Sequence, residues 1–356
     1  MKKDFASDNN SGMTPECMAA IAEANCGHAP AYGDDEWTQR ACATIRDVFE
    51  IECEVFFTFN GTATNSLALA HLCRSYHSVI CHSLAHVETD ECGAPEFFSS
   101  GSKLLLAGGN DGKVSPAELN RLVHLRQDIH YPRPRILSVT QATELGTIYE
   151  ISELEELGAL AHGLGLKVHM DGARFSNALA ALHCSPKDIT WKAGVDVLCL
   201  GGTKNGMLAS EAVVFFNKEI AAEFDYRCKQ AGQLASKMRF LAAPWSAMLR
   251  DGAWLRYAGN ANRMAALLAA GLHTIPGVAL FREPQVNTVF VTLPPLVISK
   301  LRALGWNFYE FIGQGSVRLM CSWDTTEDDV LRFVKDLKEI LSSTESENES
   351  LGIRNR

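Results

Sequence analysis

Short apolar runs alternate with longer amphipathic segments along the first 250 residues of the chain. The segments between the runs carry apolar residues at helical spacing, for example at 115–127 and 152–165. Strands that are apolar throughout and separated by helices predict an α/β fold whose mostly parallel sheet is covered on both faces. The predicted strands lie at 54–59, 78–81, 103–107, 135–140, 166–170, 195–202 and 211–216.

Two of the predicted helices begin with a capping pattern. Ser115 is followed three residues later by Glu118, and Ser152 is followed by Glu155 at the same spacing. A serine at the N-cap accepts a hydrogen bond from the third helical residue, and the acid at that position reaches back to the cap. We therefore expect both serines to cap helices.

The pattern changes near residue 250, where a long helical stretch leads into two or three further strand-like runs. The length of 356 residues also favours one large domain and a smaller one. The predicted division is an N-terminal arm at 1–20, a large domain at 21–250, a small C-terminal α+β domain at 251–345 and a polar tail at 346–356.

Composition and charge argue against several classes of function. The net charge is −9 without a basic block, which disfavours nucleic acid and acidic membrane surfaces as partners. No apolar run approaches the roughly 18 residues that a membrane span needs. The N-terminal residues lack the apolar core of a signal peptide, and the 11 cysteines are scattered and odd in number. We therefore expect a cytoplasmic protein with reduced thiols.

Two residues that could carry chemistry follow predicted strands. Lys204 comes after the run at 195–202 and is either an exposed strand-end lysine or a desolvated, nucleophilic amine. Asp171 comes after the run at 166–170 and is either a cap or a functional acid. Because the carboxyl ends of parallel strands meet at one edge of a sheet, the acid and the amine can share a site.

The segment FNGTATNS at 59–66 provides a third feature, where a strand passes into a helix. Its backbone N–H groups suit a phosphate, although an ordinary Thr or Asn cap would have the same sequence. It matches the glycine-rich turn of a dinucleotide-binding oxidoreductase poorly. A phosphate cradle, an anion for a ring nitrogen and an imine-forming lysine are together what pyridoxal 5'-phosphate (PLP) requires.

Five motifs, HMDGARFSNA, LGGTKNG, GTATNSLAL, HVETDECGAPEFFSSG and SVTQATELGTIY, resemble the threonine aldolase (β-eliminating lyase) family. The resemblance covers about residues 5–325 and points to the low-specificity branch, which includes phenylserine aldolase. It implies the aspartate aminotransferase-like fold (PLP fold type I) and retro-aldol cleavage of L-threonine, L-allo-threonine and related β-hydroxy-α-amino acids to glycine and an aldehyde. Phenylserine aldolase activity, or another PLP-dependent β-elimination, is the alternative.

The same resemblance implies roles for individual residues. Lys204 would bind PLP as an imine, and Asp171 would pair with the pyridine nitrogen. Gly61 and Thr62 would bind the phosphate, and His86 would stack on the ring.

The substrate carboxylate would be bound by Arg174 and Arg318, with Ser7 beside them. Lys237 either reaches the phosphate of a neighbouring subunit or is an ordinary exposed lysine, since relatives are homodimers or homotetramers with sites at the subunit interface. Tyr32 and Asp34 are further candidates for the rim of the pocket.

The catalytic base is left open by one departure from the family pattern. Many threonine aldolases carry a histidine in a THNG segment, where this chain has ATELG and therefore Glu144. The candidates for the base are His86, Glu144, Glu91 and a bound water. A metal is not expected, because the HSLAH segment has Ser83 where the metalloprotease pattern requires a glutamate.

Overall fold

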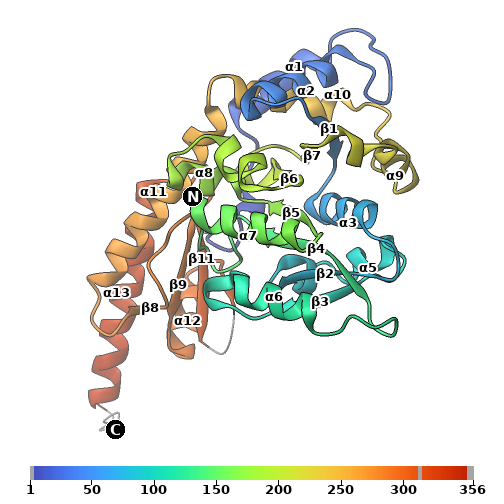
Figure 1. The fold of residues 1–356 in the computed structure, drawn as a ribbon. Helices are drawn as coiled ribbons and strands as arrows, with labels where there is room; N and C mark the ends of the chain where they lie inside the picture. Colours follow the sequence, from blue (N-terminus) through green and yellow to red (C-terminus); the bar gives the residue numbers. More distant parts are fainter. Residues whose placement is uncertain (1–3, 312–314, 351–356) are drawn as a thin grey trace. The chain divides into compact units, whose positions relative to one another are not determined.

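The computed structural model describes residues 4–311 and 315–350, and of residues 344–350 only the backbone (Figure 1). The chain forms two compact units. One unit comprises Gly12–Arg256, and the other combines the N-terminal segment up to Ser11 with Tyr257 onward.

The larger unit is built on a seven-stranded sheet (Figure 1). β7 is antiparallel to both of its neighbours, and the remaining pairs are parallel. All seven predicted strands are present, so the predicted α/β fold with a mostly parallel sheet is confirmed. In spatial order the strands are β1 (Glu54–Thr58), β7 (Glu211–Phe215), β6 (Val197–Gly201), β5 (Lys167–Gly172), β4 (Arg133–Thr140), β2 (His77–His82) and β3 (Lys103–Ala107).

Helices cover this sheet, and every residue of β6 and β7 is buried as a result. Helix α3 packs against β5, β6 and β7, whereas α6 and α7 pack against the strands from β3 to β5. The helices of the larger unit are α1 (Pro15–Ala24), α2 (Glu36–Phe49), α3 (Gly61–Leu72), α4 (His86–Thr89), α5 (Ala94–Phe98), α6 (Pro116–His124), α7 (Ile151–Gly163), α8 (Phe175–Leu182), α9 (Phe224–Gln230) and α10 (Arg239–Arg250).

One of the two predicted caps is confirmed and the other is wrong. Ser115 Oγ accepts from the backbone N–H of Glu118 at 3.2 Å, as expected for the N-cap of α6. Helix α7 begins two residues before the predicted position, with Glu150 as its N-cap. The backbone N–H of Glu150 donates to Glu153 Oε2 at 2.7 Å, so this pair forms the capping box in place of Ser152.

The smaller unit contains an antiparallel sheet of four strands, whereas two or three were expected. The strand missed by the sequence pattern, Tyr309–Glu310, is two exposed residues long and therefore has no apolar alternation to detect. The elements of this unit are α11 (Ala253–His273, beginning in the larger unit), β8 (Ala279–Leu280), β9 (Thr288–Thr292), α12 (Pro295–Ala303), β10 (Tyr309–Glu310), β11 (Ser316–Met320) and α13 (Glu327–Ser350).

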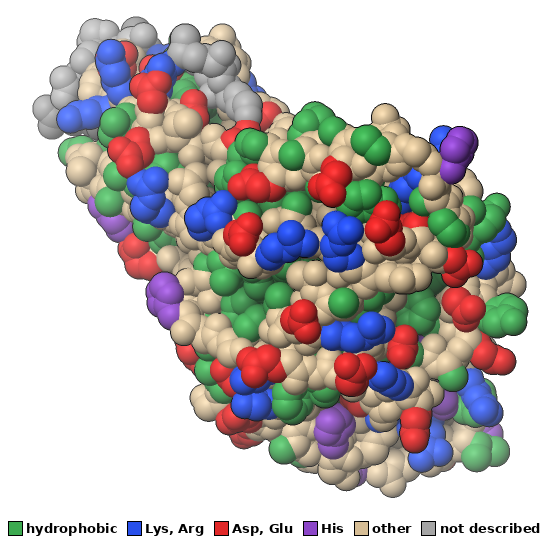
Figure 2. All heavy atoms as spheres, turned by 90° about the horizontal axis from the view of Figure 1, so that it is seen from above, with side chains coloured by type: hydrophobic (Ala, Val, Ile, Leu, Met, Phe, Trp, Pro, Cys, Tyr) green, Lys and Arg blue, Asp and Glu red, His purple; other side chains and the backbone are tan. Residues whose placement is uncertain are grey.

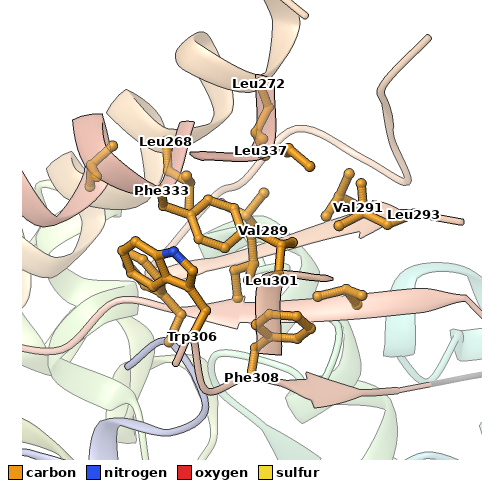
Figure 3. Packing of buried hydrophobic residues seen from close by; sticks show 14 of the residues in the cluster. Leu268, Leu272, Val289, Val291, Leu293, Leu301, Trp306, Phe308, Phe333 and Leu337 are labelled. Carbon is orange, nitrogen blue, oxygen red and sulfur yellow. The ribbon is translucent and has the colours of Figure 1, made fainter. Parts of the chain in front are cut away.

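A cluster of aliphatic and aromatic side chains forms the core of the smaller unit (Figure 3). Phe333 packs edge-on against Trp306 with ring centroids 5.0 Å apart, and Phe5 stacks on Trp306 at 5.7 Å. The predicted N-terminal arm therefore divides in the structure, because Phe5 draws the first residues into this core while Gly12 onward belongs to the larger unit. The predicted polar tail begins within α13, and its residues 351–356 lie outside the described part of the chain.

The surface shows neither a large patch of one charge in the view of Figure 2 nor a long apolar helix among the described residues. On the face drawn in Figure 2, acidic and basic side chains are interspersed rather than gathered by sign. Within residues 4–311 and 315–350, no helix combines the length and the apolar character that crossing a membrane requires.

Candidate active site

A pocket lies in the larger unit where the parallel strands end. Its lining includes Thr140 at the end of β4, Asp171 near the end of β5, and Lys204 in the short helix η5 (Thr203–Asn205) that follows β6. The structure thus brings together an acid and an amine that are 33 residues apart in the chain. The other lining residues are Gly61, Asn65, His86, Ala142, Glu144, Ala173 and Arg174.

The turn that carries Lys204 is held tightly. A Cβ atom on Gly201 would lie 2.4 Å from the carbonyl oxygen of Ala173, so a glycine lets the end of β6 come this close to the segment after Asp171. Three hydrogen bonds fix the residues around the lysine: Gly202 N–H to Glu211 Oε2 (2.7 Å), Ser210 N–H to Thr203 Oγ1 (3.2 Å) and Asn205 Nδ2 to the carbonyl of Trp254 (2.9 Å).

Asp171 is a buried carboxylate with two neutral donors. Asn65 Nδ2 donates to its Oδ2 and the backbone N–H of Ala173 donates to its Oδ1, both at 2.9 Å. Within the described residues it forms no ion pair with a basic side chain. Because neutral hydrogen bonds offset only part of the cost of burying a charge, the site suits a cationic partner from outside the chain.

His86 is tied to the same network through Glu91. His86 Nδ1 lies 2.9 Å from Glu91 Oε1, and Asn65 Nδ2 donates to that oxygen at the same distance. The hydrogen bond to Glu91 raises the pKa of His86, while burial raises the pKa of Glu91. His86, Glu91 and Asp171 each offer one ligand atom, and these three atoms all lie within 4.8 Å of one another, a spacing that a metal ion can use. The Asn65 amide bridges the two acids, so hydrogen bonds account for this grouping.

Glu144 presents a carboxylate whose two oxygens differ. Its Oε1 accepts from the backbone N–H of His86 at 2.8 Å and from Thr140 Oγ1 at 3.0 Å. Its Oε2 is buried and has no hydrogen-bond partner among the residues that the structure describes. Burial, followed by the charge of Asp171, raises the pKa of Glu144 to about 7. A fixed carboxyl group that titrates near neutrality therefore lines the pocket.

The start of helix α3 offers unused backbone donors. Asn60 is the N-cap, and its Oδ1 accepts from the N–H of Ala63 at 2.9 Å. The N–H groups of Gly61 and Thr62 have no acceptor in the described part of the chain. A Cβ atom on Gly61 would meet no atom within 4 Å, and Gly61 lines the pocket, so the helix start is open beside this residue. Such a helix start suits an anion.

Of the three residues predicted to bind the substrate carboxylate, one lines this pocket and two belong to the smaller unit. Arg174 precedes helix α8 and lines the pocket. Arg318 belongs to the smaller unit, where its Nη2 donates to the carbonyl of Ala6 at 3.2 Å and its guanidinium lies over the ring of Tyr309. Ser7 follows in that same N-terminal segment and caps the turn at Asp8–Asn10.

Lys237 and Tyr32 line a second hollow of the larger unit, together with Phe59. The backbone N–H of Tyr32 donates to the carbonyl of Ser236 at 3.2 Å, which holds the two segments together. None of these residues is among those that line the first pocket, and neither is Asp34.

Two residues of the site were not predicted from the sequence. Asn65 follows Gly61 by one helical turn, so it faces the same side of α3, and that spacing could have revealed it. Glu211 is an acid at the start of a strand that is otherwise apolar, which is also an unusual pattern.

The larger unit has a mostly parallel sheet with an amine, an acid and an open helix start at its carboxyl edge, and the chain also has a smaller α+β unit. This combination is typical of the aspartate aminotransferase-like class. Residues 4–294 match the family described as beta-eliminating lyase, and the chain belongs to that family. The family resemblance predicted from the sequence motifs is thereby confirmed.

Individual relatives agree with this assignment. The chain is 60% identical to the low specificity L-threonine aldolase of Pseudomonas aeruginosa over 96% of its own length and 99% of the relative. The threonine aldolase structure from Leishmania major superposes with a TM-score of 0.89 at 30% identity, covering 95% of this chain and 99% of that one. Serine palmitoyltransferase from S. paucimobilis, solved with bound PLP and myriocin, shares the fold with a TM-score of 0.70 at 17% identity, covering 99% and 88%.

Proposed function

We propose that this protein is a PLP-dependent low-specificity L-threonine aldolase, which cleaves L-threonine, L-allo-threonine and related β-hydroxy-α-amino acids to glycine and an aldehyde. The observation that supports it most directly is the pocket shared by Lys204, Asp171 and Gly61 in a chain 60% identical to a protein with that name.

The residues of the pocket fit PLP. Lys204 would hold the cofactor covalently, and Asp171 would receive its protonated ring nitrogen in place of a basic side chain. The open N–H groups of Gly61 and Thr62 would bind the phosphate, and His86 would contact the ring. When bound, PLP supplies an electron-withdrawing ring that stabilises negative charge at the substrate Cα.

The chain's own residues would then orient the substrate and move its protons. Arg174 and Arg318 would bind the substrate carboxylate as planar donors, assisted by Ser7. Fixing this group sets which bond at Cα is aligned for cleavage. The β-hydroxyl loses its proton, the Cα–Cβ bond breaks, the aldehyde carbonyl forms, and Cα takes up a proton to give glycine.

We infer that Glu144 is the side chain that accepts the proton of the β-hydroxyl. Its Oε2 has no partner among the described residues, and a pKa of about 7 lets it exchange a proton at neutral pH. His86 is a weaker candidate because the Glu91 hydrogen bond favours its protonated form. Glu91 already accepts two hydrogen bonds at Oε1 and is not among the residues that line the pocket.

The test of the function is a comparison of substrates with the purified, PLP-loaded protein. L-threonine and L-allo-threonine should release glycine and acetaldehyde, whereas L-serine should release little pyruvate and ammonia. Faster release of glycine and benzaldehyde from phenylserine would favour the phenylserine aldolase alternative. Pyruvate and ammonia as the main products would instead identify a β-eliminating lyase and overturn the proposal.

Assembly and location are parts of the same proposal. The family resemblance implies sites at subunit interfaces, so we expect a homodimer or homotetramer, and we expect it in the cytoplasm. Lys237, which lines the second hollow, would then reach the phosphate site of a neighbouring subunit. Light scattering of the purified protein at several concentrations tests the assembly, and a stable monomer with full activity would contradict it.

Replacing Arg318 by leucine is expected to raise the KM for L-threonine by about 10- to 100-fold, with a smaller effect on kcat, because a charge-assisted hydrogen bond to the carboxylate is lost. Steady-state kinetics measures both constants. Arg302→Leu is the matched control, since Arg302 belongs to the same unit and pairs with Glu310 at 3.0 Å. An unchanged KM in Arg318→Leu would argue against the carboxylate contact.

A further inference from the structure

Glu211 is a buried acid that the proposed mechanism does not use. It is the first residue of β7, where its Cα pairs with Gly201 of β6 on one side and with Thr58 of β1 on the other. Its side chain is enclosed, in a position where a charge is unfavourable unless donors surround it. Strand positions of this kind are normally apolar, as the other residues of β7 are.

The donors that surround Glu211 come from the residues immediately before Lys204. The backbone N–H of Gly202 donates to Glu211 Oε2 at 2.7 Å, and the polar groups of Thr203 oppose the rise in the pKa of the same carboxylate. Thr203 Oγ1 accepts from the N–H of Ser210 at 3.2 Å, which holds the same turn from its other side. The acid therefore fastens the turn that carries the lysine.

The charge of Glu211 also acts on the lysine itself. Burial raises the pKa of Glu211 to about 7, while its hydrogen bonds and the positive charge of Lys204 oppose that rise. Coupling between two titrating groups is reciprocal, so an ionised Glu211 must favour a proton on the Lys204 nitrogen. Among the described residues, the buried thiol of Cys199 on β6 also interacts with Glu211, and burial raises the pKa of this thiol well above its usual range.

We propose that Glu211 is a positioning residue for Lys204, which fixes the turn through the N–H of Gly202 and lets its negative charge act on the lysine nitrogen. This inference rests on the proposed PLP chemistry of Lys204. It adds a residue to that site which acts through the lysine and not on the substrate.

The test separates charge from hydrogen bonding with two substitutions in the PLP-loaded, full-length protein. Glu211→Gln keeps an oxygen that accepts from Gly202 N–H but removes the charge, whereas Glu211→Ala removes both. The visible absorbance of the bound cofactor is titrated with pH in the absence of substrate, and the rate of PLP uptake is measured by the same absorbance. Asp196→Asn is the control, because Asp196 is a buried acid that accepts from Val168 N–H and lies near the opposite end of β6.

In Glu211→Gln, the midpoint of the absorbance titration should fall by about one pH unit or more, because an opposite charge near the lysine nitrogen is lost. The rate of PLP uptake should stay close to wild type in this variant and fall in Glu211→Ala. An unchanged midpoint in Glu211→Gln would overturn the electrostatic role, and wild-type uptake in Glu211→Ala would overturn the positioning role. Neither readout needs aldolase turnover, so a failure of the proposed reaction would appear separately in the substrate assay.

Discussion

Lys204→Ala is expected to lose the visible absorbance of bound PLP and to lower kcat for L-threonine on the order of 10³-fold or more, because no other amine can replace a covalent nucleophile. Absorbance spectra and glycine release of the purified variant measure the two effects. The size of the loss follows from the placement of the lysine. The residues around it are fixed by hydrogen bonds to Glu211, Ser210 and Trp254, so a neighbouring lysine cannot move into its place.

Lys192→Ala provides the control for this experiment. Lys192 lies in the same unit, is half-exposed and pairs with Asp188 at 3.5 Å, so its loss should leave both the absorbance and the turnover unchanged. Full activity of Lys204→Ala together with retained absorbance would remove the lysine from the proposed mechanism.

The sheet and the central pair of the site could be predicted from the sequence for one physical reason. Strands of a covered parallel sheet are continuous apolar runs, so their carboxyl ends are visible as the points where polar residues appear. Asp171 and Lys204 both stand at such points, and the topology places both in one pocket. The start of α3 was recognisable in the same way, because a Gly–Thr pair follows the strand that ends at Thr58.

Other parts of the site depend on contacts that no local pattern reveals. The role of Glu211 arises from the pairing of β7 with β6, and Glu91 gains its partners from two helices that are separate in the chain. The assignment of Phe5 to the smaller unit follows from packing against Trp306, which is about 300 residues away. Strand β10 was missed because two exposed residues carry no periodic signal.

The pH dependence of the reaction should report the ionisation of Glu144. Burial raises its pKa from an ordinary value near 4.5 to about 7, so the fraction of the ionised base increases as the pH rises through neutrality. The wild-type kcat for L-threonine should therefore rise over this range. In Glu144→Gln it should be lower by about 10²- to 10⁴-fold, and the rise around neutral pH should be absent.

A second measurement shows whether this loss is one of chemistry or of folding. A carboxyl group whose pKa is raised on folding leaves stability unaffected below its unfolded pKa and reduces it as the pH rises through its folded pKa. Above neutral pH, ionised Glu144 should thus lower the free energy of unfolding by about 3 kcal/mol relative to acid pH, and Glu144→Gln should lack this penalty. The variant is therefore expected to be as stable as the wild type at acid pH. Above the pKa of Glu144 it should be more stable and far less active than the wild type.

Denaturant unfolding and steady-state kinetics across the pH range provide the comparison. Glu88→Gln is the matched control, since Glu88 lies on the same short helix as His86 but is exposed, and its loss should change neither the stability nor the pH profile. A Glu144→Gln variant that keeps the wild-type pH profile would exclude Glu144 as the base and return the role to His86 or a bound water. If Glu144→Gln loses activity but unfolds with a higher free energy at alkaline pH, the carboxylate contributes to the reaction and not to stability. The neutral amide would then stabilise the fold more than the ionised carboxylate does.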